Sequence, residues 1–134
     1  MKKLWIFSAL AILFCFTIAT TYAQQYGVCV WEKKDDKLVY ISFVFKYKED
    51  AQTGYSTNNT ALICSAENSL KIEVGSKYKN YTTTFYLRKD RNLFYPYTED
   101  EAIKLRTKLI SEFRGKDYTV HSLDVAYDRD ACKH

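Results

Sequence analysis

Apolar residues are concentrated at the start of the chain, behind two lysines. The run from Leu4 to Ile18 carries no charge, and the small residues Thr21 and Ala23 follow it. A positive start, a short apolar core and small residues at the −3 and −1 positions are typical of a cleavable export signal. A retained membrane anchor is the alternative, but a span needs about 20 apolar residues. We therefore expect residues 1–23 to be a signal peptide cleaved after Ala23.

Beyond that run, apolar and polar residues alternate with the period of two that is typical of β-strands. Tyr26–Glu32 and Leu38–Lys48 are the first two predicted strands, and the charged turn Lys33–Lys37 joins them as a hairpin. The second strand is expected to be central, because one of its faces is wholly apolar or aromatic. That face comprises Val39, Ile41, Phe43, Phe45 and Tyr47.

The middle and the end of the chain are expected to add three strands. The polar stretch Glu49–Thr60 predicts a loop, and Ala61–Ser69 fits either a short helix or a strand. Leu70, Ile72 and Val74 alternate with charged residues, which predicts a half-buried strand that ends at Gly75. Similar alternation predicts strands at Tyr81–Leu87 and Tyr118–Tyr127.

One segment, about residues 98–115, predicts a long amphipathic helix. Thr98 and Glu101 have the spacing of a capping box at the helix start, and Gly115 is a suitable stop. Apolar residues recur at helical spacing along one face: Ala102, Leu105, Leu109 and Phe113, with Ile103 and Ile110 beside them. The order of elements predicts an α+β fold for a single domain at 24–134. Its sheet would be mainly antiparallel, with about five strands and this helix packed on one face.

Three cysteines follow the predicted cleavage site: Cys29, Cys64 and Cys132. In an oxidising compartment two of them are expected to pair. Cys29 and Cys64 both lie in apolar surroundings, so we favour a Cys29–Cys64 disulfide with Cys132 free. A bridge from Cys132 to the body of the domain, or no bridge at all, are the alternatives.

Charge and localisation narrow the classes of partner. The whole chain has a net charge of +4, and loss of Lys2 and Lys3 would leave +2. This near balance gives no argument for a nucleic-acid partner or an anionic membrane. We expect an exported protein, periplasmic or extracellular, with no integral membrane anchor after cleavage; the two-lysine start favours a bacterial source.

Catalytic and metal chemistry find little support in the sequence. His121 could act as a general base and Cys132 as a nucleophile, but no partner residues are placed for either. Both are more simply explained as a strand residue and an incidental or bridged cysteine. No spacing typical of zinc or calcium ligands occurs. We therefore assign no catalytic residue, no metal and no cofactor.

The stretch 77–97 interleaves cations with aromatic residues. Aromatic side chains and arginines are enriched where proteins recognise partners. The plainer explanation is that tyrosine and phenylalanine suit strands while lysine and arginine keep the outer face wet. From this stretch we select eight candidate partner-binding residues: Tyr78, Tyr81, Tyr86, Arg88, Lys89, Arg91, Tyr95 and Tyr97.

These observations favour a small exported binding protein that recognises another protein or a glycan through this Tyr/Arg-rich surface. Two alternatives stay open. One is a small secreted hydrolase that uses His121 or Cys132. The other is a structural accessory component of an envelope assembly, held by an intermolecular bridge from the unpaired cysteine.

Overall fold

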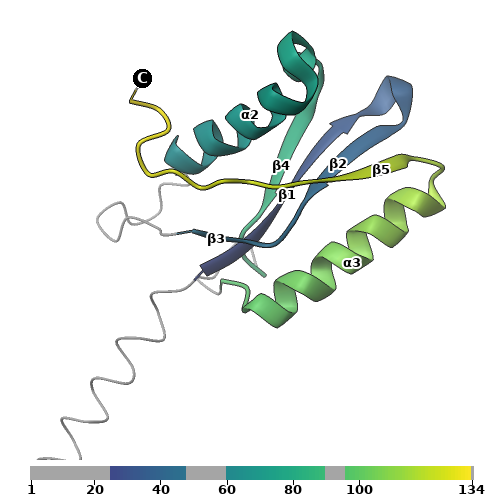
Figure 1. Ribbon diagram of the computed structural model, residues 1–134. Coiled ribbons are helices and arrows are strands. Elements are labelled where there is room, and N and C mark those ends of the chain that lie inside the picture. The colour runs from purple at the N-terminus through teal and green to yellow at the C-terminus, as the bar shows by residue number, and fades with distance from the viewer. Residues whose placement is uncertain (1–24, 48–59, 90–95, 134) are drawn as a thin grey trace, which may run out of the picture.

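A mixed five-stranded sheet lies between two helices in the computed structural model, which describes residues 25–47, 60–89 and 96–133 (Figure 1). The α+β fold predicted from the sequence is confirmed. The predicted signal peptide at 1–23 and most of the predicted loop at 49–60 lie outside the described residues. So do Arg91 and Tyr95 of the expected binding surface.

Strand β1 (Gln25–Lys33) is the centre of the sheet. It pairs antiparallel with β2 (Leu38–Ser42) and, near its start, with β3 (Phe45–Tyr47). The short 3-10 turn η1 (Lys34–Asp36) closes the predicted hairpin between β1 and β2. On its other side β1 pairs antiparallel with β4 (Thr82–Tyr86). Strand β5 (Thr119–Leu123) is parallel to β2 at the opposite edge, so the sheet is mixed.

A β-bulge divides the long second strand of the sequence prediction into β2 and β3. Val30 pairs with Ile41, whereas Gly27 pairs with Phe45, so β1 advances by 30 − 27 = 3 residues while its partner advances by 45 − 41 = 4. One extra residue reverses the alternation of side chains. The expectation that Val39 to Tyr47 present one apolar face is therefore wrong. Phe45 and Tyr47 pack on the face opposite Val39 and Ile41, and Phe43 is 50% exposed.

Arg106, from helix α3 (Glu99–Gly115), holds this bulge in place. Arg106 donates from Nε to the Ser42 carbonyl at 2.8 Å and from Nη2 to the Ser122 hydroxyl at 2.6 Å. Its guanidinium also lies over the Phe43 ring, 4.7 Å from the centroid. Partial burial lowers the pKa of Arg106 from its ordinary value, and the side chain is paired in the folded state.

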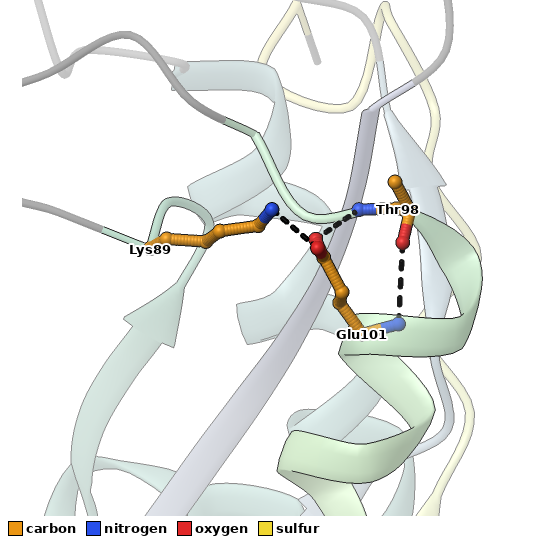
Figure 2. A network of polar contacts seen from close by, with 3 residues as sticks. All are labelled: Lys89, Thr98 and Glu101. Carbon is orange, nitrogen blue, oxygen red and sulfur yellow. Dashed lines mark hydrogen bonds and ion pairs between the residues drawn. The ribbon is translucent and has the colours of Figure 1, made fainter.

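Helix α3 (Glu99–Gly115) is the predicted amphipathic helix, with Thr98 as its N-cap. Both hydrogen bonds of the capping box are present: Glu101 N–H donates to Thr98 Oγ1 at 3.3 Å, and Thr98 N–H donates to Glu101 Oε2 at 3.0 Å (Figure 2). Ala102 and Leu109 are buried against one face of the sheet. The sheet residues of this cluster are Val28, Val30, Val39 and Ile41.

A second helix, α2 (Thr60–Val74), covers the other face of the sheet. The strand predicted at Leu70–Val74 is therefore wrong. Leu62, Ala66 and Leu70 recur every four residues and are buried, whereas Ile72 is 88% exposed. The segment is helical rather than extended because a helix packs these three side chains against the core cluster that contains Cys29 and Trp31. Gly75, with φ +63°, leaves the helix in the left-handed conformation typical of a helix end. The 3-10 segment η2 (Gly75–Asn80) then leads to β4.

The C-terminal segment returns across the fold to the start of α2 (Figure 1). Cys64 and Cys132 form a disulfide, and Cys29 is free and buried. The expected Cys29–Cys64 pairing is thus wrong; the structure has the alternative that ties Cys132 to the body of the domain. Ser65 reinforces this attachment, because its hydroxyl accepts from Asp128 N–H at 3.0 Å. The last predicted strand ends early at Leu123, since the chain turns towards α2.

Candidate binding groove

The structure separates the expected Tyr/Arg-rich surface into two parts. Tyr78 and Tyr81 pack on the α2 side of the sheet. Tyr86 and Tyr97 pack on the α3 side, against the cluster that contains Ala102. Successive side chains along a strand point to opposite faces of the sheet, so Tyr81, just before β4, and Tyr86, within it, lie on different faces. Tyr97 comes just before α3 and lies on the side of that helix. The six described candidates therefore do not form one continuous surface.

Lys89 and Arg88 are the two described cations of that set. Lys89 forms an ion pair with Glu101, the capping glutamate of α3 (Figure 2). This contact lowers the pKa of Glu101. Arg88 forms an isolated antiparallel bridge with Pro96. Both residues hold the end of β4 to the start of α3, so their structural role is clear.

A cavity of about 190 Å³ lies between α2, η2 and β4. We call it the α2–β4 groove. Its helical wall is the i, i+4, i+7 stripe Ile63, Glu67 and Leu70. Strand β4 contributes Thr83 and Phe85 from alternate positions. The remaining lining residues are Trp31, Tyr78, Lys79 and Tyr81.

Trp31 is the most informative residue of the groove. It is fully buried on β1, yet its indole N–H has no hydrogen-bond partner among the described residues. A buried polar group without a partner costs about 1–3 kcal/mol, and buried donors are normally paired. Trp31 therefore lines the groove as a fully buried ring, and its unsatisfied N–H lies beneath the accessible surface.

The walls of the groove combine aromatic and charged groups. Lys71 pairs with Glu67 at 2.9 Å and lies over the Tyr78 ring, 4.5 Å from its centroid. The Lys71 contact holds the pKa of Glu67 below its usual range. At the end of the groove, the Tyr81 ring packs edge-on against Tyr40, with centroids 5.9 Å apart. The groove therefore offers apolar surface with both signs of charge at its rim.

A second hollow is larger but less specific. It measures about 370 Å³ and is lined by Thr107, Ile110, Ser111 and Arg114, all on α3. A single helix supplies these residues, and none is a buried polar group without a partner in the described chain. The α2–β4 groove is the stronger candidate, because residues of four elements, β1, α2, η2 and β4, converge there.

The structure shows the surroundings of His121 and Cys132, the two residues considered for catalysis. His121 is exposed and stacks on Tyr40, with ring centroids 5.2 Å apart. The Cys132 sulfur is bonded to Cys64, so neither a Cys132 nucleophile nor an intermolecular bridge from Cys132 is available. The cysteine left over is Cys29, which is fully buried and whose pKa burial raises. Across the described ranges, no three His, Cys, Asp or Glu side chains gather as metal ligands.

Comparison with known proteins gives no relative: no protein-family model, no curated protein and no solved structure matches the chain. Within residues 25–47, 60–89 and 96–133, no helix has the length and apolar character needed to cross a bilayer.

Sequence reasoning found part of the groove and missed the rest. Tyr78 and Tyr81 were expected at a binding surface, whereas Trp31, Ile63 and Glu67 were not. Trp31 reads as an ordinary core residue, because nothing in the sequence shows that its N–H stays unpaired. The stripe of Ile63, Glu67 and Leu70 carried a usable signal, but the helix had first to be separated from the competing strand pattern.

Proposed function

We propose that the protein is an exported binding protein that holds a segment of its partner in the α2–β4 groove. The observation that carries this proposal is the α2–β4 groove itself, an aromatic-lined cavity of about 190 Å³ that also carries charged groups. Its rings supply contact area, and the charges of Glu67 and Lys79 give orientation. This combination suits recognition, and it needs no catalytic group.

Export is part of the proposal. The Cys64–Cys132 disulfide is consistent with an oxidising compartment, because disulfides persist mainly in exported proteins. The apolar run behind Lys2 and Lys3 provides the signal for it. N-terminal sequencing of the native protein, with Gln24 as the expected first residue, tests this part.

Trp31 also provides the test of binding. The sequence holds two tryptophans, Trp5 and Trp31, so cleavage of the leader leaves Trp31 as the single indole fluorophore. A ligand that fills the groove should change its emission, because Trp31 lies in the groove wall. We would titrate the native protein with displayed random-sequence peptides and with an oligosaccharide array, and follow binding together with Trp31 fluorescence. A protein that retains the leader would carry Trp5→Phe.

A pair of substitutions on one helix makes the test specific. Ile63 lies at the groove and is 43% exposed, whereas Ile72 is 88% exposed and does not line the groove. Ile63→Lys should weaken any ligand found by at least about tenfold, and Ile72→Lys should not. Equal affinities for the two variants, or no ligand that alters Trp31 emission in either library, would refute the proposed function.

A further inference from the structure

We infer that the partner enters the groove as an extended peptide that adds a new strand to the outer edge of β4. This inference rests on the proposed function and specifies its ligand. Strand addition uses the backbone of a sheet edge for affinity and alternate side-chain pockets for specificity. The structure supplies both at β4.

The first argument concerns the backbone groups of β4. The Lys37 carbonyl accepts from Thr119 N–H at 2.8 Å, and Phe43 N–H donates to the Leu123 carbonyl at 3.0 Å. In a strand, the N–H and C=O of one residue point to the same side, and successive residues alternate. The backbone N–H and C=O groups of odd-numbered residues from Lys37 to Phe43 thus point to β5, and those of Tyr40 point to β1.

This alternation carries across the sheet. Tyr40 pairs with Trp31, so the Trp31 backbone faces β2 and its neighbours Val30 and Glu32 face β4. The backbone of Cys29, two residues before Trp31, also points to β2, because its N–H donates to the Ser42 hydroxyl at 2.8 Å. The β4 partners of Val30 and Glu32 are Thr84 and Thr82. The backbone groups of Thr83 and Phe85 therefore point outward, and no described strand pairs with them.

The second argument is that these same two residues line the groove. Thr83 and Phe85 line the cavity, and their backbone groups lie on the edge of β4 that no described strand pairs with. A strand added here would lie about 4.8 Å from β4 and beside α2, which runs next to β4 (Figure 1). One of its side chains would enter the cavity from the same register that forms the backbone hydrogen bonds.

The third argument is size. Pockets for small molecules occupy roughly 300–1,000 Å³, whereas this cavity holds about 190 Å³. It suits one side chain better than a whole small ligand.

The fourth argument is that β4 lacks the usual protection of an edge strand. Natural edges carry charges, prolines or bulges that prevent pairing with another chain. Strand β4 reads Thr-Thr-Thr-Phe-Tyr, with no charge and no proline, and its three threonines are exposed. An open, uncharged edge of this kind accepts a strand.

The experiment uses peptides selected from a displayed random-sequence library on the native protein. Amide hydrogen exchange should be fast at Thr83 and Phe85 in the free protein and become slow in the complex. N-methylation of alternate peptide amides should weaken binding by about tenfold or more, because each removes a donor from the ladder. N-methylation of the intervening amides should have little effect.

A matched pair of protein variants tests the same geometry. Thr83→Pro removes one outward N–H without touching the β1–β4 ladder, a position that proline tolerates on an edge, and should weaken peptide binding. Thr84→Val keeps the ladder and changes only the opposite face, so it should bind normally. Thermal unfolding of both variants shows whether each is folded. If Thr83→Pro does not fold, binding of the N-methylated peptides to the native protein tests the strand addition instead.

Two kinds of failure can be told apart. Oligosaccharides that bind and shift Trp31 emission, with no selectable peptide, would overturn the strand addition and leave the proposed binding function intact. Slow exchange at Thr83 and Phe85 in the free protein would also overturn it, since another segment or a second copy would occupy the edge. An absence of any groove ligand would refute both proposals.

Discussion

The backbone N–H of Cys29 donates a 2.8 Å hydrogen bond to the side-chain hydroxyl of Ser42, and both residues are fully buried. This bond lies at the bulge, where the ladder between β1 and its neighbour changes register. A buried N–H at such a point would otherwise lack an acceptor. Ser42 thus allows one strand to pack apolar residues first on the α3 face and then on the α2 face.

Ser42→Ala should destabilise the protein by about 1–3 kcal/mol, because it leaves the buried Cys29 N–H without an acceptor. The midpoint of urea unfolding measures the effect. Ser69→Ala is the control: Ser69 is half-buried and its hydroxyl only donates back to the Ser65 carbonyl within α2. Equal midpoints for the two variants would contradict the role of Ser42.

Gly27→Ala should destabilise the protein by about 1–3 kcal/mol through overpacking. An added Cβ would lie 2.7 Å from Leu87 Cδ2 and 3.1 Å from Phe45 Cζ. Phe45 cannot retreat easily, because it is buried. Gly115→Ala is the matched comparison, since nothing lies within 4 Å of its added Cβ. We expect that variant to be neutral or to gain a few tenths of a kcal/mol; a Gly27→Ala protein as stable as Gly115→Ala would disprove the clash.

Reduction of the Cys64–Cys132 bridge should lower the free energy of unfolding by up to about 4 kcal/mol, as expected for a closed loop with a sequence separation of 68. Chemical denaturation with and without reductant measures this. In the Cys64→Ser/Cys132→Ser double variant, reductant should have no effect on the free energy of unfolding.

Thiol labelling with peptide mapping tests the burial of the third cysteine, Cys29. Cys29 should resist labelling in the native state, because it is buried with a raised pKa, and react after unfolding. Rapid native labelling of Cys29 would be inconsistent with the structure.

Acidification should weaken the start of α3. The ion pair with Lys89, followed by the hydrogen bond from Thr98 N–H, lowers the pKa of Glu101. A lowered folded-state pKa means that the contribution is complete above the pKa of an ordinary glutamate, about 4.3, and is lost as pH falls through the lower folded value.

The comparison of Glu101→Gln with wild type isolates this effect. Stability measured from neutral to strongly acidic pH should decline more steeply for wild type in that window, so that the two curves converge at low pH. Parallel curves would rule out the linkage.

Thr98→Ala removes the other hydrogen bond of the capping box and should lower the free energy of unfolding by about 1 kcal/mol at neutral pH.

The sequence alone determined those elements whose pattern is local and unopposed. The hairpin of β1 and β2, strand β4 and helix α3 with its Thr98 cap could be predicted, because one period or one capping motif dominates each. The α+β class followed from their order. The sequence could not decide between helix and strand at residues 61–74, because Leu62, Ala66 and Leu70 fit one period while Leu70, Ile72 and Val74 fit the other.

Only the tertiary structure decided that residues 61–74 are helical, where the bulge falls and which cysteines pair. The cluster around Cys29 and Trp31 selects the helix, because it buries one stripe of α2 and leaves Ile72 in solvent. The same packing brings Cys132 to Cys64 across 68 positions. It also creates the groove, since the residues of β1, α2, η2 and β4 that line it meet only when the chain is folded.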